Sequence, residues 1–200
     1  MRLKFSGLAI LLFLAGELSA RAQVAPSARV GGIPLGISFG ISRYYLDYGP
    51  GRYMEGAVFR AGAPFFHGFG LDVSARSIFM FTPESLTRMQ QTTYLAGVFY
   101  ESRPFRGLRA FGRFGGGLGT IEFSSTNPFY TTGSSTVYAP SGGFEYPIVD
   151  KVYLRGEYEY QFWKNFQGPN FLNPRGVTLG VTYYLRGYRV RPHPIDRQTP

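Results

Sequence analysis

Hydrophobic and polar residues alternate strictly along two segments near the end of this chain. In residues 151–163 every second side chain is apolar, glycine or aromatic, and the positions between carry charge or polarity. Residues 177–186 repeat the pattern, with Val177, Leu179 and Val181 on one face. A side-chain period of two is typical of a β-strand that has one apolar face. Two strands are therefore predicted in succession.

Six further segments alternate less regularly: 35–48, 53–61, 69–81, 92–101, 106–123 and 136–146. In residues 69–81, Leu71 and Val73 oppose Asp72, while Ile78 and Met80 weaken the polar face. Glycine (27 residues) and aromatics (18%) are too abundant for a helical bundle. The prediction is an all-β chain of eight strands.

The predicted connections alternate in length. Linkers near 102–106 and 147–150 are short, whereas 124–135 and 164–175 are long and rich in Asn, Ser, Thr, Pro or Gly. The remaining predicted loops on the long side are 49–52, which is short, and 82–90. Short turns on one side and longer loops on the other are typical of a transmembrane β-barrel. Eight membrane-crossing strands and their connections use the length of the chain without leaving a second domain.

The first 22 residues have the three parts of a secretory signal peptide. Arg2 and Lys4 form a basic start, an apolar run follows, and Ala20 and Ala22 flank an A-x-A cleavage site. The run is too short for a membrane-spanning helix, which needs about 20 apolar residues. We expect the mature chain to begin at Gln23, with a lead-in over 23–32, a barrel over 33–186 and a disordered basic tail over 187–200.

The chain carries a net charge of +9. Cleavage would remove three basic residues and Glu17, leaving +7 on a chain whose cations are almost all arginine. Secretion makes nucleic acid an unsuitable partner, so no nucleic-acid binding is expected. Arginine suits bidentate pairing with carboxylates and phosphates, including buried pairs and lipid head groups.

Alternation alone does not say which face meets lipid, and a soluble barrel with an apolar interior has the same pattern. Aromatic residues gather at strand ends, as in the interfacial girdles of membrane barrels. The predicted girdle residues are Tyr44, Tyr45, Tyr48, Phe79, Phe81, Tyr158, Tyr160 and Phe162. This distribution favours an apolar exterior and a polar interior.

Charged residues fall on the face opposite the apolar one. They are Asp72, Arg76, Arg109, Arg113, Glu145, Arg155, Glu157 and Glu159. The interior of an eight-stranded barrel is only wide enough to be filled by side chains. Four arginines and four carboxylates would therefore have to pair with one another, as a neutral network inside the barrel. The alternative is a solvated outer face of a soluble barrel.

Over residues 33–186 the pattern resembles the small outer-membrane β-barrel proteins, the OmpA-like transmembrane domain group. Its sharpest element lies in 178–185, where Thr178, Gly180, Tyr183 and Leu185 look like the final-strand signal read by the barrel assembly machinery. The resemblance implies an eight-stranded antiparallel up-and-down barrel in the outer membrane of a Gram-negative bacterium. It also implies contact with outer-membrane lipid and lipopolysaccharide. The chain departs from the group in its tail and has no room for a peptidoglycan-binding domain.

Catalytic and cofactor chemistry is weakly supported. The glycine-rich run 112–119 is followed by neither a helix nor the Lys-Ser/Thr of a phosphate loop, so a strand that bends inside a barrel explains it better. The two histidines, His67 and His193, have no plausible serine and carboxylate beside them. No cysteine is present, and no cofactor or metal site is expected.

The expected role is structural or interactive, through the loops on the long side, and not enzymatic. A narrow channel or carrier for a small solute is the alternative, gated by the interior charges at Arg155, Glu157 and Glu159. A lipid-modifying enzyme at the membrane surface comes third. The loop partner is not identified by the sequence.

Overall fold

The structure is a computed structural model that describes residues 34–47, 51–82, 89–122, 132–164 and 172–185. Within these ranges it contains nine strands and no helix. The strands are β1 (Gly36–Tyr45), β2 (Tyr53–Phe66), β3 (Phe69–Thr82), β4 (Gln90–Glu101), β5 (Arg109–Glu122), β6 (Thr132–Val149), β7 (Val152–Tyr160), β8 (Phe162–Lys164) and β9 (Arg175–Tyr184). Among the described residues, no helix is long and apolar enough to cross a membrane.

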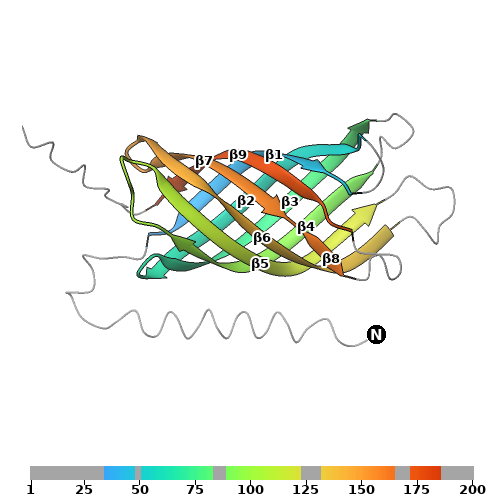
Figure 1. The fold of residues 1–200 in the computed structure, drawn as a ribbon, viewed down its shortest axis with the longest axis horizontal. Helices are drawn as coiled ribbons and strands as arrows, with labels where there is room; N and C mark the ends of the chain where they lie inside the picture. Colours follow the sequence, from blue (N-terminus) through green and yellow to red (C-terminus); the bar gives the residue numbers. More distant parts are fainter. Residues whose placement is uncertain (1–33, 48–50, 83–88, 123–131, 165–171, 186–200) are drawn as a thin grey trace, which may run out of the picture. The chain divides into compact units, whose positions relative to one another are not determined.

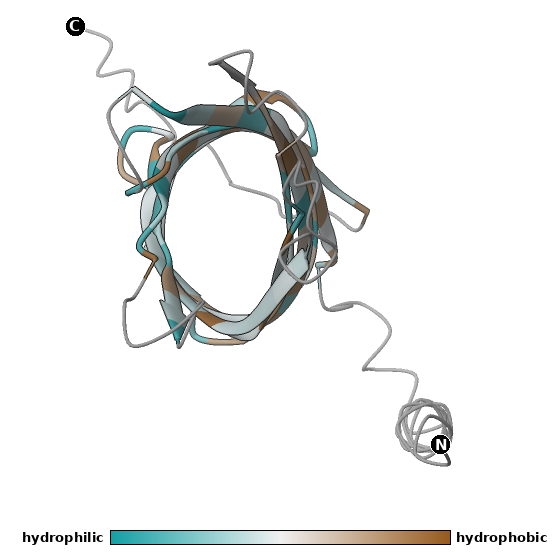
Figure 2. Ribbon diagram, turned by 90° about the vertical axis from the view of Figure 1, so that its right-hand side faces the viewer, coloured by the Kyte–Doolittle hydropathy of each residue, from teal (hydrophilic) through white to brown (hydrophobic). Residues whose placement is uncertain are grey.

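The strands form one closed antiparallel sheet in meander order (Figures 1 and 2). Consecutive strands from β1 to β7 pair with one another, β7 pairs with β9, and β9 pairs with β1 to close the ring. Strands β7 and β8 both pair with β6 and count as one interrupted strand. The predicted eight-stranded antiparallel barrel is therefore confirmed.

The interruption between β7 and β8 has a local cause. The pairs Ser141↔Glu159 and Tyr138↔Phe162 share one register, which sets Pro140 opposite Tyr160. Proline has no N–H to donate to a neighbouring strand, so the ladder breaks where it sits. On the side away from β6, the backbone N–H of Gln161 donates to the Pro174 carbonyl oxygen at 2.7 Å. The residue between β7 and β8 therefore stays hydrogen-bonded within the barrel.

The connections from β2 to β3, from β4 to β5 and from β6 to β7 lie together at one end of the barrel, with the start of β1 and the end of β9. This end is named here the turn end. His67 and Gly68 (φ 46° and 92°) join β2 to β3, and Arg106 and Gly107 (φ 51° and 85°) lie between β4 and β5. Two consecutive positive φ values are typical of the tight turns that suit twisted hairpins. The opposite end, where 46–52, 83–89, 123–131 and 165–174 connect the strands, is named the loop end.

Two strands are longer than their sequence patterns predict. β2 continues past Ala61 to Phe66. The sequence did not predict this extension, because Gly-Ala-Pro carries no polar alternation that would mark a strand. β6 begins at Thr132, inside the predicted loop 124–135, where Ser, Thr and Gly resemble a connection although they pair in register with β5. At its other end β6 includes most of the predicted linker 147–150.

Several predictions fall outside the described residues. They are the signal segment with Ala20 and Ala22, the lead-in 23–32, the tail 187–200, Tyr48, and most of the predicted long-side loops. The side chain of Phe81 is likewise not described. These predictions stay as they were made.

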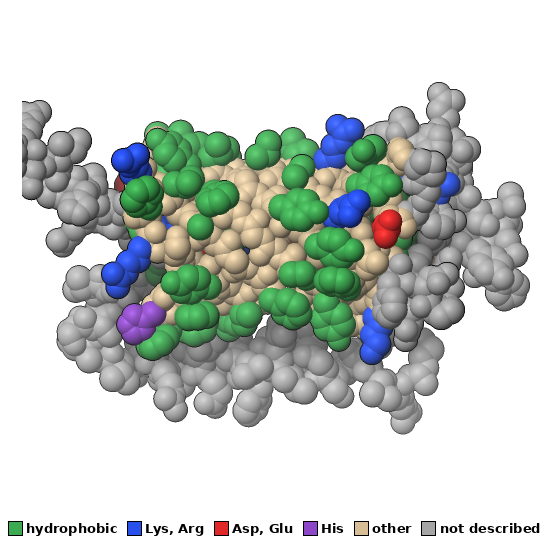
Figure 3. Space-filling model, viewed as in Figure 1, with side chains coloured by type: hydrophobic (Ala, Val, Ile, Leu, Met, Phe, Trp, Pro, Cys, Tyr) green, Lys and Arg blue, Asp and Glu red, His purple; other side chains and the backbone are tan. Residues whose placement is uncertain are grey.

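The outer wall is apolar through most of its height (Figure 3). Phe39, Ile41 and Leu179 are 62%, 68% and 67% exposed, whereas charged side chains such as Arg113 and Glu159 are buried in the interior. An apolar exterior around a charged interior is the arrangement of a membrane barrel. It runs opposite to the soluble barrel that the alternation also allowed.

At the loop end the two faces exchange character. Thr136 and Ser134 face outward on β6, while Val137 and Ile121 are completely buried inside. The buried apolar cluster there comprises Tyr44, Leu46, Met54, Ile78, Met80, Met89, Leu95, Ile121, Val137, Ala139, Trp163 and Leu172. The expectation of a polar interior is therefore met only in part in this half of the barrel, where buried Gln91, Ser135 and Gln161 lie among the apolar side chains. The girdle position predicted for Tyr44 is wrong, because its side chain is completely buried inside the barrel. Its neighbour Tyr45 faces outward instead.

Candidate functional site

The structure brings all eight predicted interior charges together, and adds Arg60 and Glu101. The ten residues form one chain of nine ion pairs in which arginine and carboxylate alternate. In order from the turn end, the chain is Glu101, Arg109, Glu145, Arg155, Glu157, Arg60, Asp72, Arg113, Glu159 and Arg76. Five positive and five negative groups leave this network, named here the interior charge chain, formally neutral.

Arg60 joins the two halves of the chain. Its guanidinium pairs with Glu157 through both terminal amino groups, one of which donates to Oε1 at 2.9 Å, and its Nε lies 3.5 Å from Asp72. The Arg60 and Glu157 side chains are 7% and 1% exposed. Glu157 also lies 3.4 Å from Arg155, which donates to Glu145 at 2.7 Å. A bidentate pair of this kind fixes both side chains in one geometry.

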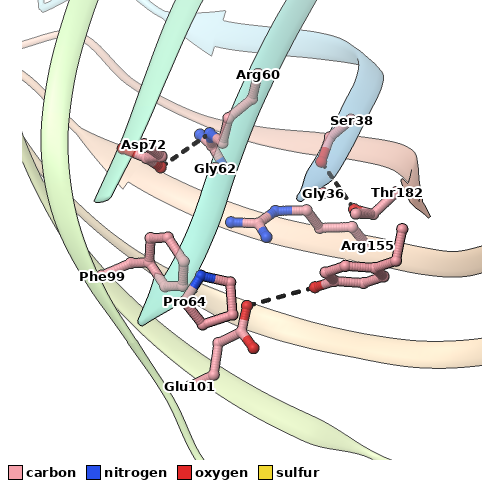
Figure 4. Close-up of a pocket in the computed structure, with 11 residues that line it drawn as sticks. Gly36, Ser38, Arg60, Gly62, Pro64, Asp72, Phe99, Glu101, Arg155 and Thr182 are labelled. Carbon is pink, nitrogen blue, oxygen red and sulfur yellow. Dashed lines mark hydrogen bonds and ion pairs between the residues drawn. The ribbon is translucent and has the colours of Figure 1, made fainter. Parts of the chain in front are cut away.

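At the turn end the chain finishes among aromatic rings. The Arg109 guanidinium lies 5.2 Å from the ring centre of Tyr153 and 5.9 Å from that of Tyr184. The Tyr184 hydroxyl donates to Glu145 at 2.9 Å. It also lies 3.4 Å from Glu101, which is labelled in Figure 4. These rings fill the space between the charges and the mouth of the barrel.

Toward the loop end, a polar relay links the charges to the apolar cluster. Arg76 and the Tyr44 hydroxyl both donate to Glu159, at 2.5 and 3.0 Å. Gln161 donates to Glu159 at 2.7 Å and accepts from the Trp163 indole at 2.9 Å. Trp163 is completely buried and lies against Gly119, where a Cβ would come within 2.3 Å of the ring. The relay satisfies polar groups at the boundary with the apolar half.

The space left inside the described barrel is small. One interior cavity, lined by Arg60, Asp72, Glu101 and Arg155 among others, measures about 20 Å³ (Figure 4). Another, beside Glu157, measures about 10 Å³. A cavity needs roughly 10–15 Å³ to hold one water molecule. Each of these two spaces is therefore about large enough for a single water molecule.

Two interior charges, Arg60 and Glu101, were not predicted from the sequence, because the alternation around them is weak. Arg60 shares its face with Met54 and Val58, which are also buried, so that face does not read as polar. Glu101 is the last residue of β4 and resembles the start of the following linker. Glu101 lies an even number of residues from Gln91 and Thr93, so all three share one face of β4. Gln91 and Thr93 are buried, and this spacing was the signal that could have placed Glu101 inside.

The residues of the predicted assembly signal lie on both faces of β9. Thr178 is buried, and its hydroxyl lies 2.8 Å from that of Ser42 on β1. Gly180 lies where β9 approaches β1, and a Cβ there would come within 2.5 Å of the Phe39 carbonyl. Tyr183 and Leu185 face outward, 44% and 47% exposed. Recognition by the assembly machinery stays a prediction.

Two other features singled out in the sequence, the glycine-rich run and His67, lie within the described residues. Residues 112–119 lie within β5, and His67 lies in the turn after β2 with its ring 4.1 Å from that of Phe66. Within the described ranges, no group of three or more His, Cys, Asp or Glu side chains could hold a metal ion.

A closed antiparallel barrel with an apolar wall, a paired charged interior and short turns at one end is the architecture of a small integral protein of the bacterial outer membrane. The comparisons agree. The profile of the outer membrane protein beta-barrel domain family matches residues 8–184, and the chain belongs to that family. None of the curated proteins compared by sequence matches the chain.

Three solved structures show the same fold. Neisserial surface protein A is 12% identical, with a TM-score of 0.59 over 76% of this chain and 97% of that one. Ail, the attachment invasion locus protein of Yersinia pestis, is 18% identical, with a TM-score of 0.55 over 77% and 99%. OprG of Pseudomonas aeruginosa is 13% identical, with a TM-score of 0.50 over 78% and 97%.

Proposed function

We propose that this protein is a closed, non-conducting barrel of the outer membrane, with a structural or surface-interaction role carried by its loop end. The observation that carries the proposal is the filling of the interior. The charge chain occupies the half toward the turns, and the apolar cluster around Trp163 occupies the half toward the loops. Water and ions would need both halves to rearrange before they could pass.

Two structural neighbours support a role in surface contact. One is named a surface protein and another an attachment protein, and Ail has also been solved with the heparin analogue sucrose octasulfate. Those names describe those proteins. In this chain the corresponding end of the barrel would present the loops at 49–52, 82–90, 124–135 and 164–175.

A narrow gated channel is the second candidate, because four arginines of the interior charge chain each have two carboxylates within reach. The distances to the two carboxylates are up to 3.6 Å, and the four arginines are Arg60, Arg109, Arg113 and Arg155. Such an arginine can exchange partners without becoming unpaired. A gate of this kind would open the turn half of the interior but leave the apolar half in place.

Conductance across planar lipid bilayers separates the two candidates. The detergent-folded mature chain is inserted at high salt, with a general porin as the positive control. Silent bilayers, under conditions in which the porin conducts, are the expected result. Unitary current steps that disappear in Glu157→Gln or Arg155→Gln would contradict the closed barrel and establish the channel.

A further inference from the structure

Four outward-facing side chains form one row across the wall at the loop end. The register pairs Tyr160 with Arg175, Arg175 with Tyr45, and Tyr45 with Tyr53, so the row crosses β7, β9, β1 and β2. Arg43 lies on the same face of β1, two residues nearer the turn end. Arg43, Tyr45, Tyr53 and Arg175 are named here the girdle arginine site.

The two guanidinium groups of this site lie over one pair of rings. The Arg43 guanidinium carbon is 4.8 Å from the ring centre of Tyr53, and that of Arg175 is 5.5 Å from the ring centre of Tyr45. The two ring centres are 5.5 Å apart. Arg43 therefore extends from its own level on β1 toward the loop end, as a basic side chain does when it keeps its head group out of hydrocarbon.

The height of the site corresponds to the rim of the membrane. Tyr45 lies ten residues from Leu35 at the turn end. Strands that rise about 3.3 Å per residue and tilt by about 40° cover about 25 Å over that length, which is the height of the apolar band of an outer-membrane barrel. Because the short turns of such barrels face the periplasm, this rim contacts the head groups of the outer leaflet.

The charge at this rim is uneven around the barrel. On the far side, the outward row Ser77, Thr92 and Thr120 crosses β3, β4 and β5 without a charge. At the girdle arginine site, the two arginines are accompanied by Glu55, whose carboxylate lies 3.4 Å from the Arg43 Nε. The Arg43 and Glu55 side chains are 60% and 48% exposed, so this pair is accessible from the membrane surface.

We propose that the girdle arginine site binds a phosphate group of a phosphorylated outer-leaflet glycolipid. Guanidinium groups match phosphate oxygens with paired N–H donors, and they are less strongly hydrated than lysine ammonium groups. The tyrosine rings hold the two guanidinium groups over one small area, which lowers the ordering cost of binding. Glu55 opposes the incoming phosphate and limits its affinity. The site is independent of whether the barrel conducts.

The test uses the full mature chain folded in detergent, with fluorescently labelled lipid A as the probe. Unlabelled phosphorylated and dephosphorylated lipid A compete with it. The double variant Arg43→Gln with Arg175→Gln should weaken binding of phosphorylated lipid A about tenfold or more, because each arginine contributes a charge-assisted hydrogen bond. Dephosphorylated lipid A should bind the wild type as weakly as phosphorylated lipid A binds the double variant.

Two further variants extend the test: one should strengthen binding, and the other is a control that should leave it unchanged. Glu55→Gln should strengthen binding severalfold, because it removes the repulsion and leaves the tyrosine rings in place. The matched control is Arg106→Gln, since Arg106 lies 5.5 Å from the Phe105 ring centre at the turn end, where the opposite leaflet lies. That control should leave the affinity unchanged, and all variants should keep the folded mobility on unboiled gels.

Three outcomes would overturn the proposal. Equal competition by phosphorylated and dephosphorylated lipid A would mean that the phosphate is not recognised. An equal loss in the Arg106→Gln control would mean that net charge alone acts. If sucrose octasulfate bound in an Arg43-dependent manner while phosphorylated lipid A did not compete with it, the site would serve a soluble sulfated glycan instead.

Discussion

At the scale of single residues, the position of a charge within the interior charge chain determines what its loss costs. Glu157 lies mid-chain between Arg60 and Arg155, whereas Glu101 ends the chain beside Arg109, which also contacts Glu145. Removing one partner of a buried ion pair costs about 3–5 kcal/mol, because the other charge stays buried. We expect Glu157→Gln to lower the free energy of unfolding by this amount, and Glu101→Gln by clearly less. Urea unfolding in lipid vesicles measures both.

The exposed pair Arg43 and Glu55 supplies the control for that series. Surface ion pairs contribute about 0–1 kcal/mol, so Glu55→Gln should leave the unfolding midpoint nearly unchanged. Equal losses in Glu157→Gln and Glu101→Gln would contradict the ordering of the chain. That result would mean that the ten charges act as separate local pairs.

The alternation along each strand predicted eight of the ten residues of the interior charge chain, but not the link that joins its two halves. The eight charges found from the sequence share faces with other polar residues, whereas Arg60 shares its face with Met54 and Val58. Without Arg60, the eight predicted charges contain no link between Glu157 and Asp72. Tyr44 shows the converse limit, because adjacent tyrosines at a strand end do not reveal which of them faces inward.

At the scale of elements, the exchange of faces at the loop end implies that part of β6 extends beyond the hydrocarbon. Thr136 lies thirteen residues from Val149, at the turn end of the strand. At 3.3 Å per residue and a tilt of about 40° this distance is about 33 Å, more than the apolar band of about 25 Å. We expect a cysteine at Thr136→Cys to react with a membrane-impermeant maleimide when the protein is in lipid vesicles.

The matched variant on the same strand and face is Phe144→Cys. Phe144 is 55% exposed on the apolar wall, where lipid would cover it, so the same reagent should fail to label it until the protein is unfolded. The chain has no cysteine of its own, so labelling reports only the introduced residue. Equal labelling at both sites would contradict the exchange of faces.

The two faces of β9 allow assembly to be separated from packing. Gly180 lies close against the backbone of β1, whereas Tyr183 points outward. We expect Gly180→Ala to impair folding in detergent, because the added Cβ meets backbone. Tyr183→Ala should fold in detergent like the wild type but accumulate less in the outer membrane of cells. Normal accumulation of Tyr183→Ala, measured by fractionation and immunoblotting, would count against the assembly signal.

Elements were predictable where their alternation is uninterrupted. Residues 151–163 and 177–186 gave strands close to those observed, because apolar and polar positions differ strongly in both. The start of β6 was predicted as a loop because Ser, Thr and Gly, which are common in turns, also suit a strand that leaves the membrane. The change from a polar to an apolar interior left no mark in the period of the pattern, since either face gives the same alternation.

At the scale of the whole molecule, sealing the ring and pairing its interior charges make one cooperative unit. The β1 and β9 ladder closes the barrel over ten residue pairs, and the Leu185 amide donates to the Leu35 carbonyl at 2.9 Å where the two ends of the sheet meet. No edge strand is left in the described barrel to fray or to pair with another molecule. Partial opening would expose both backbone groups and buried ion pairs. We therefore expect unfolding to require heat rather than detergent alone.

Gel mobility in SDS tests this expectation directly. The detergent-folded chain that begins at Gln23 should migrate at different positions before and after boiling, because the closed barrel binds less SDS than the unfolded chain. Intact mass of the protein recovered from outer membranes should show the same first residue if cleavage follows Ala22. A single mobility, together with recovery from the soluble periplasmic fraction, would contradict a membrane barrel. The apolar wall would then have to be covered by something other than lipid.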